Sequence, residues 1–470
     1  MRKLLLCLLF VGYATGILAQ SFVSKLESAY NNFSVDPQLR YGLSSLTVLN
    51  ARTGEVVFAK GEAIGLAPAS TLKTITSITA FRMLGDNFTW ETLLGYTGSL
   101  SDGILNGDLI LCGNGDPTLG SSRYDQSRAD VLLNRWLSAI KKAGIRGING
   151  RIVADDRLFG TQSLPQGWVW QDIGNYYGAG ASALNWRENE FALSIKPGSR
   201  VGDPVSLTVS GMEGKYLRMV NEVTTGKVGS GDNVYAYSAP YTDLIYVRGT
   251  YGIDLKKTIM ASLPDAAYHL ALEVRNKLVA SSVEVSGEAT TTRRINMAGQ
   301  GFYPVSTILD RYRSPTLSRV VYWLNQKSLN LYAENILRTL AVKQGKEGST
   351  TDGVSVLKEF WNARLQVDPG SVDILDGSGL SPENRITTLT MARILLDAKN
   401  EPWFDSFYES LPVYNDMKMK SGSISKVLAY AGYQTSANGT PLVFSFIVNH
   451  FNGPTSSIRE KMFSVLDVLK

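Results

Sequence analysis

The most informative stretch of the sequence reads Pro68-Ala69-Ser70-Thr71-Leu72-Lys73. Pro68 interrupts the chain just before an apolar segment that predicts a helix over 70–84. Ser70 and Lys73 are three residues apart, so a helix brings both side chains to the same side. A lysine that is desolvated and lies near another cation can accept a proton from such a hydroxyl. The stretch therefore predicts a serine nucleophile activated by a lysine.

The Ser-x-x-Lys spacing is weak by itself, because it occurs four times, at Ser70/Lys73, Ser138/Lys141, Ser355/Lys358 and Ser423/Lys426. The second and third pairs fit solvated helix faces, and the last pair follows a predicted strand. The first pair differs because it opens an apolar helix. We therefore take Ser70 as the candidate nucleophile.

Other kinds of active site are disfavoured. The two histidines, His269 and His450, lie in apolar contexts, where a histidine is more often a structural residue. No Gly-x-Ser-x-Gly segment occurs, which argues against an ordinary Ser-His-Asp hydrolase. Two scattered histidines and Cys112 argue against zinc. We expect no metal and no organic cofactor.

The N-terminus predicts export. Arg2 and Lys3 precede an apolar run and small residues up to Ala19, which is the pattern of a signal peptide over 1–19. A retained anchor is the alternative, but the run is short for a bilayer, and no later stretch is apolar enough to span one. With Cys112 as the single remaining cysteine, a bacterial periplasm fits best. The net charge of +5 includes no basic cluster of the kind that binds nucleic acid.

The pattern of elements predicts an α+β fold. Strands are expected near both ends of the chain, at 43–49, 55–59, 417–423, 429–435 and 441–449. We expect them to form one antiparallel five-stranded sheet flanked by helices, including a long helix over 317–342. Residues 20–90 and 291–470 would form the catalytic domain. Residues 91–290, rich in short strands, would form a large, mainly β inserted module, either one domain or two nested domains.

Two further motifs follow Ser70 in order. Ser328-Leu329-Asn330 comes late in the chain, and Lys420-Ser421-Gly422 follows on a predicted strand, with Ser423 after it. This trio resembles the signature of serine penicillin-interactive enzymes. Segments 111–119 and 376–381 are similar to markers of the D-Ala-D-Ala carboxypeptidase/endopeptidase family, the class C low-molecular-mass penicillin-binding proteins with large inserted domains. The resemblance implies a transpeptidase domain of the serine β-lactamase and penicillin-binding-protein type.

The resemblance also implies how the reaction would run. Ser70 would form an acyl-enzyme, Lys73 would accept its proton, and Ser328 would relay a proton to the leaving amine. Substrate-binding roles would fall to six residues. Asn330 would hold the substrate amide and Lys420 would supply positive potential, with Gly422 completing its motif. The hydroxyl of Ser421, where threonine is commoner, would bind the terminal carboxylate. The backbone amides of Ser70 and Ser423 would form the oxyanion hole. Asp155 is the candidate contact for a stem-peptide amine, and a simple turn residue is the alternative.

The expected function is that of a serine-type D-alanyl-D-alanine carboxypeptidase. It would act on peptidoglycan stem peptides and be acylated by β-lactams. The balance between carboxypeptidase and endopeptidase activity stays open. A β-lactamase or esterase on the same fold, and an inert cell-wall binding protein, are the alternatives.

Overall fold

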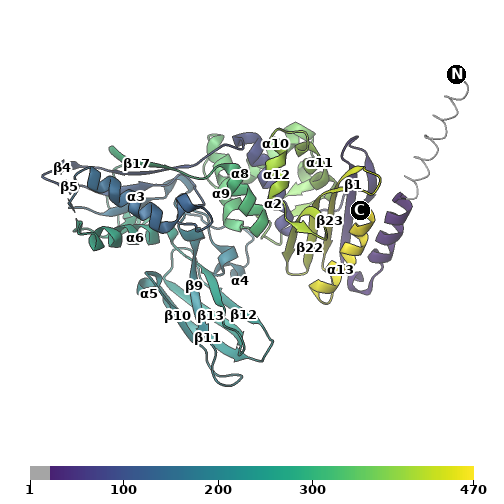
Figure 1. Cartoon of the computed structure of the whole chain (residues 1–470), viewed down its shortest axis with the longest axis horizontal. Coiled ribbons are helices and arrows are strands. Elements are labelled where there is room, and N and C mark those ends of the chain that lie inside the picture. Colours follow the sequence, from purple (N-terminus) through teal and green to yellow (C-terminus); the bar gives the residue numbers. More distant parts are fainter. Residues whose placement is uncertain (1–21) are drawn as a thin grey trace, which may run out of the picture. The chain divides into compact units, whose positions relative to one another are not determined.

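The computed structural model describes residues 22–470 and divides the chain into two compact units (Figure 1). The first unit contains the described part of Met1–Arg82 together with Asn325–Ser328 and Leu357–Lys470. The second contains Met83–Leu324 and Leu329–Val356. The predicted signal peptide over 1–19 lies outside the described residues. The domain bounds expected from the sequence stay a prediction.

A six-stranded antiparallel sheet forms the centre of the first unit. Its strand order is β2-β1-β23-β22-β21-β20. The strands are β1 (Leu43–Asn50), β2 (Val56–Lys60), β20 (Val413–Tyr414), β21 (Met417–Ile424), β22 (Val427–Thr435) and β23 (Pro441–Asn449). The expected pairing of both chain ends in one antiparallel sheet is confirmed, and the short β20 adds an edge. The inner strands β22 and β23 are buried almost throughout, as their continuous apolar runs require.

Helices cover both faces of this sheet. The helical residues 22–34 and α13 (Thr455–Leu466) share one apolar core with one face of the strands. On the other face, α11 (Thr388–Ala398) packs on β1, β22 and β23. The 3-10 turn η2 (Ala69–Thr71) packs on β21 and β22, and the chain continues directly into α2 (Leu72–Leu84). The short helix α12 (Phe404–Ser410) and the two-stranded ladder of β18 (Val372–Asp373) and β19 (Arg385–Ile386) complete the unit.

Helix α2 is buried on all sides, with Leu72 to Phe81 shielded from solvent. A helix of this kind must pair its polar side chains inside the core. Thr76 donates to the carbonyl of Gly377 at 2.7 Å, and Thr79 accepts from the indole of Trp361 at 2.9 Å. These bonds hold the helix that follows Ser70 at a defined position.

The prediction of one long helix over 317–342 is wrong in one respect. The structure has two helices, α8 (Leu317–Lys327) and α9 (Asn330–Lys343), and the break falls at Ser328. Ser328 has a left-handed φ of 57°, which no α-helix accommodates. Further along the chain, α10 covers Thr350–Leu365.

The second unit contains most of the short strands. A five-stranded sheet has the order β16-β8-β6-β3-β17 and a four-stranded sheet the order β15-β7-β5-β4. Two three-stranded sheets have the orders β10-β9-β14 and β11-β13-β12. Their helices include α3 (Ala129–Lys142), α5 (Glu213–Tyr216) and α6 (Ala266–Ala280). The strands are β3 (Glu91–Tyr96), β4 (Ser99–Ser101), β5 (Ile104–Asn106), β6 (Leu109–Cys112), β7 (Gly147–Ile148), β8 (Ile152–Asp155), β9 (Glu190–Lys196), β10 (Ser206–Val209), β11 (Arg218–Gly226), β12 (Asp232–Tyr237), β13 (Leu244–Gly252), β14 (Thr258–Ser262), β15 (Glu284–Val285), β16 (Ala289–Thr291) and β17 (Thr307–Arg313).

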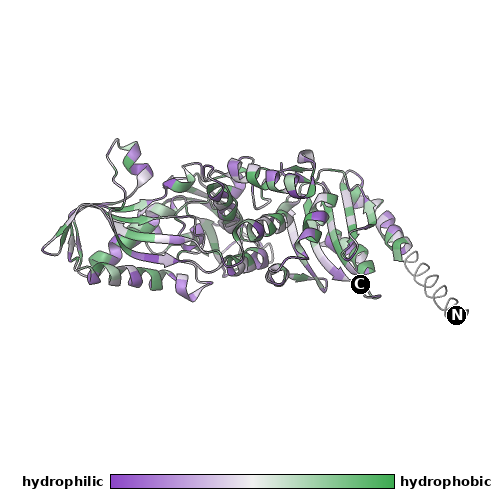
Figure 2. Ribbon diagram, turned by 90° about the horizontal axis from the view of Figure 1, so that it is seen from above, coloured by the Kyte–Doolittle hydropathy of each residue, from purple (hydrophilic) through white to green (hydrophobic). Residues whose placement is uncertain are grey.

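One apolar core joins the strands of the second unit to α3 and α6. Along many helices the colour changes between hydrophobic and hydrophilic, as expected where one face is buried (Figure 2). The mainly β character of the inserted module is confirmed by this unit. Within residues 22–470, no helix is both long enough and apolar enough to cross a bilayer.

Candidate active site

The side chains of Ser70 and Lys73 meet at the start of α2. Lys73 Nζ lies 2.8 Å from Ser70 Oγ and 2.6 Å from the carbonyl oxygen of Ser378. Lys73 is fully buried, whereas Ser70 is half-buried. The residue before the serine, Ala69, has a left-handed φ of 45°. Strain of this kind is kept only where surrounding structure enforces it, and it occurs often at active sites.

The second and third motifs meet in the same unit. Lys420 Nζ lies 3.0 Å from Ser328 Oγ and 2.8 Å from the carbonyl oxygen of Ser421. The left-handed backbone of Ser328 ends α8 and gives the hydroxyl this position. Lys420 is 1% exposed. Burial, and then the like charge of Lys73, hold the pKa of Lys420 well below its usual value. The two lysines are therefore electrostatically coupled.

Gly422 lets strand β21 approach the nucleophile. A Cβ atom at this position would lie 2.6 Å from the carbonyl oxygen of Pro68 and 2.7 Å from the amide nitrogen of Ser70. No side chain fits there without moving one of the two backbones. The neighbouring residues on the strand, Ser421 and Ser423, are half-buried and exposed respectively. The arrangement brings the third motif against the peptide that carries Ser70.

The loop 376–381 supplies a part of the site that the sequence reasoning missed. The buried carboxylate of Asp376 accepts hydrogen bonds from the amides of Gly379 and Ser381, at 2.8 and 2.7 Å, and from Asn384 Nδ2 at 2.8 Å. The loop so shaped presents the Ser378 carbonyl to Lys73. The sequence marked 376–381 as a family segment without a role, and its glycines were the available signal of a tight loop.

Asn330 and Asp155 belong to the second unit and have partners there. Asn330 is the first residue of α9, is buried, and donates from Nδ2 to the carbonyl oxygen of Tyr177 at 2.7 Å. Asp155 ends β8 and forms a two-point ion pair with Arg157, at 2.8 and 2.9 Å. Thus the structure contains two hydrogen-bonded pairs, Lys73 with Ser70 and Lys420 with Ser328, linked by the like charges of the lysines and by the close approach at Gly422. It gives Asn330 and Asp155 separate contacts.

Cys112 is an unsuitable nucleophile. It lies opposite Asp155 in the ladder of β6 and β8. Burial, and then the charge of Asp155, raise the pKa of Cys112 to about 11. The thiol is therefore almost entirely protonated at neutral pH, which leaves Ser70 as the better candidate.

Comparison with known proteins supports the class of enzyme that this fold and network indicate, a serine peptidase of the penicillin-binding type. Residues 26–468 match the D-Ala-D-Ala carboxypeptidase 3 (S13) family. The match covers nearly all of the described residues, and the chain belongs to this family. The protein is therefore a D-Ala-D-Ala carboxypeptidase, as predicted.

Individual relatives agree with this assignment. The D-alanyl-D-alanine carboxypeptidase of Actinomadura sp. (strain R39) is 27% identical over 89% of this chain and 80% of its own length. The D-alanyl-D-alanine carboxypeptidase DacB of Haemophilus influenzae is 26% identical over 82% of this chain and 80% of its own length. The crystal structure of penicillin-binding protein 4 (dacB) from Haemophilus influenzae superposes with a TM-score of 0.78, at 23% identity, covering 94% of this chain and 97% of that chain. The recognised family and fold class are thereby confirmed.

Proposed function

We propose that this enzyme removes the terminal D-alanine from peptidoglycan stem peptides through an acyl-enzyme on Ser70. The 2.8 Å contact between Lys73 Nζ and Ser70 Oγ carries the proposal, since an amine at this distance can accept the proton of the serine hydroxyl. The family assignment supports the choice of D-Ala-D-Ala peptides over other acyl donors.

The proposed reaction has two halves. Ser70 Oγ attacks the carbonyl carbon of the penultimate D-alanine, and its proton passes to Lys73. The C–N bond then breaks, and the leaving amine takes a proton through Ser328, which releases free D-alanine. Water next attacks the ester, giving the shortened peptide and regenerating the Ser70 hydroxyl.

Substrate binding is assigned to residues of the three motifs and to Ser423. The backbone amides of Ser70 and Ser423 would stabilise the oxyanion, as donors of this kind do in acyl transfer. The hydroxyl of Ser421 would bind the terminal carboxylate, and Asn330 the substrate amide. Lys420 would supply positive potential once the bound carboxylate raises its pKa. The close approach of Gly422 to the amide of Ser70 supports the assignment of the oxyanion hole.

Intact mass after incubation with a penicillin tests the nucleophile. The wild type should gain one drug mass, and Ser70→Ala should gain none. Ser138→Ala is a matched control, because Ser138 belongs to another Ser-x-x-Lys pair but is exposed on α3. It should label like the wild type. A wild type that neither forms an adduct nor consumes the drug contradicts the proposal.

Sensitivity to β-lactams and the balance of activities need separate assays. The Haemophilus influenzae penicillin-binding protein 4 has been crystallised in a complex with a β-lactam, which supports acylation of this chain by the same class of drug. Rapid turnover of penicillin would instead favour a β-lactamase. Release of D-alanine from a peptide ending in D-Ala-D-Ala, compared with cleavage of a cross-linked dimer, measures carboxypeptidase and endopeptidase activity.

Asp155 is proposed to contact the side-chain amine of the stem peptide. Its carboxylate ends β8, is 12% exposed and is already paired with Arg157, so an incoming amine would share it. Asp155→Asn should lower kcat/KM about tenfold for a peptide with a free side-chain amine, and leave the acetylated peptide unaffected. Equal effects on both peptides would assign Asp155 to the fold instead.

Export to the periplasm, with cleavage near Ala19, is part of the same proposal. It is supported by the charged and then apolar order of the first residues and by the cell-wall activity of the family. The measurement is the N-terminal sequence of protein released by osmotic shock. A product that still begins at Met1 would contradict cleavage.

A further inference from the structure

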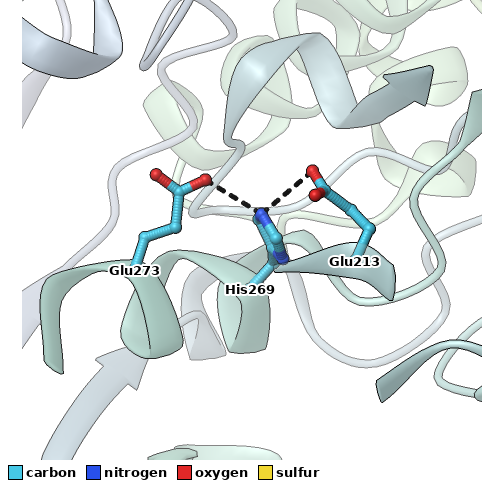
Figure 3. A group of neighbouring side chains, drawn as sticks. All are labelled: Glu213, His269 and Glu273. Atoms are coloured by element: carbon cyan, nitrogen blue, oxygen red, sulfur yellow. Dashed lines mark hydrogen bonds and ion pairs between the residues drawn. The ribbon is translucent and has the colours of Figure 1, made fainter. Parts of the chain in front are cut away.

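Three side chains of the second unit converge on one another (Figure 3). His269 Nε2 lies 3.0 Å from an oxygen of Glu273 and 3.3 Å from an oxygen of Glu213. His269 and Glu273 are one turn apart on α6, and Glu213 comes from α5, between β10 and β11. Within residues 22–470, no other three side chains of His, Cys, Asp or Glu present ligand atoms so close together.

The ring of His269 is oriented by a partner on its other nitrogen. Nδ1 lies 3.1 Å from the hydroxyl of Tyr216, and the ring is fully buried. If Nδ1–H donates to this hydroxyl, Nε2 presents a lone pair to both carboxylates. The two carboxylates around Nε2 are satisfied when this nitrogen carries a proton and donates to them, and a metal ion bound at Nε2 would take the place of that proton. This is the arrangement in which a second hydrogen bond orients a metal-binding histidine.

The carboxylate of Glu273 is also bound by Arg187. Arg187 donates from Nε and Nη2 to the two carboxylate oxygens, at 2.8 and 3.0 Å. The arginine lies in a turn whose residues Arg187, Glu188 and Asn189 all have left-handed φ values, between 53° and 57°. Three consecutive non-glycine residues in this conformation are unusual and are retained where side chains must be placed for a purpose.

The cluster is open to solvent on one side. Glu213 and Glu273 both line an open cavity of about 610 Å³, together with Arg187, Glu188 and Glu190. The wall of this cavity carries four carboxyl groups and one guanidinium group. The cavity thus supplies an entry path and room for a water ligand, which a metal site needs.

We propose that Glu213, His269 and Glu273 bind one Zn²⁺ ion, with a fourth coordination position open to the cavity. Zinc accepts nitrogen and oxygen ligands at about 2.0–2.2 Å in tetrahedral geometry, which separates neighbouring ligand atoms by about 3.3 Å. The separations of 3.0 and 3.3 Å from Nε2 fit that spacing. Mg²⁺ and Ca²⁺ prefer sites made of oxygen alone, so they should bind poorly here.

The ion would join α5 to α6 and so stabilise the connection between β10 and β11. It takes no part in the proposed acyl transfer. The sequence argued against zinc because its histidines are isolated along the chain. The helix brings Glu273 beside His269, and the tertiary fold brings Glu213 to the same point from more than fifty residues away.

Isothermal titration of the chelator-treated mature protein with ZnCl₂ tests the proposal. We expect one ion per chain, a rise in Tm with zinc, and no comparable response to MgCl₂ or CaCl₂. Glu213→Gln should weaken binding at least about tenfold, because it replaces a charged ligand by a neutral one. Glu213 is on a short surface helix, so this variant should fold even if a change of the buried His269 does not.

The chain's other histidine provides the matched control. His450 is exposed and has a left-handed φ of 59°, which asparagine also adopts readily. His450→Asn should bind zinc like the wild type, and Glu213→Gln should still be acylated by penicillin. Absence of zinc binding by the wild type overturns the proposal. So does binding that survives Glu213→Gln or is lost in His450→Asn, since the ion would then lie elsewhere.

Discussion

Replacing Gly422 by alanine should disable the enzyme without removing any reacting group. The new Cβ would lie 2.6 Å from Pro68 O, 2.7 Å from Ser70 N and 2.8 Å from Thr71 N. All three are backbone atoms of the segment that carries the nucleophile, so no side chain can rotate away to make room.

The expected loss of acylation rate follows from how far the two backbones must move apart to admit the new Cβ atom. An ordinary contact of a Cβ atom begins at 3.4 Å, so the two backbones must separate by about 0.8 Å. Strand β21 is held in register by β22, where Gly422 pairs with Ala429, so most of the shift falls on η2 and Ser70. A misplacement of about 1 Å costs about 100-fold in rate. Overpacking should also lower the free energy of unfolding by about 1–3 kcal/mol.

The assay is the second-order rate of acylation by a penicillin, followed by intact mass, beside urea denaturation of the same samples. Gly65→Ala is the control, because its Cβ would make an ordinary contact of 3.5 Å with Arg385 and its φ lies outside the left-handed region. It should keep the wild-type rate. If Gly422→Ala also acylates at the wild-type rate, the close approach of β21 does not control the position of Ser70.

Three further predictions follow from buried groups of the structure. The pKa of Lys420 in the native protein lies well below its ordinary value of 10.5. At any pH between the native and the ordinary pKa, the unfolded chain therefore carries a proton on Lys420 that the native chain lacks. The free energy of unfolding of the wild type, measured in urea, should therefore rise relative to that of Lys420→Met as the pH goes from 7 to 10. A difference between the two proteins that stays constant over this range would contradict the lowered pKa. Asp376→Asn puts an NH2 group where a carboxylate oxygen now accepts from at least one backbone amide, so the free energy of unfolding of this variant should fall by about 3 kcal/mol. Penicillin acylation should slow as the Ser378 carbonyl held against Lys73 moves. With a pKa of about 11, Cys112 should react with iodoacetamide at pH 8 at least about 100-fold more slowly in the native protein than in urea, and equal rates would show that the thiol is not shielded.

The strands of the first unit could be predicted closely because their signal is local. Apolar runs between turn residues predicted 43–49 and 441–449, and the structure has Leu43–Asn50 and Pro441–Asn449. Asn438-Gly439 is a local turn signal of the same kind, and Gly439 has the positive φ of 78° that such a turn requires.

The break at Ser328 could not be predicted, although the motif around it could. Apolar residues at helical spacing continue on both sides of it, in α8 and α9, so periodicity alone indicates one helix. The left-handed conformation of Ser328 is stabilised by what surrounds it, including the bond from Lys420. That partner is 92 residues away along the chain.

By itself, the sequence determined the class of fold, the ordered motifs at Ser70, Ser328 and Lys420, and the family. These follow from short spacings, which survive as local patterns whatever the rest of the chain does. Only the tertiary structure decided that the carbonyl of Ser378 lies against Lys73, and that Glu213 meets His269. Such contacts join residues as far apart as 305 positions. They depend on how whole elements pack, and differences of a few tenths of an ångström in packing cannot be predicted from a local sequence pattern.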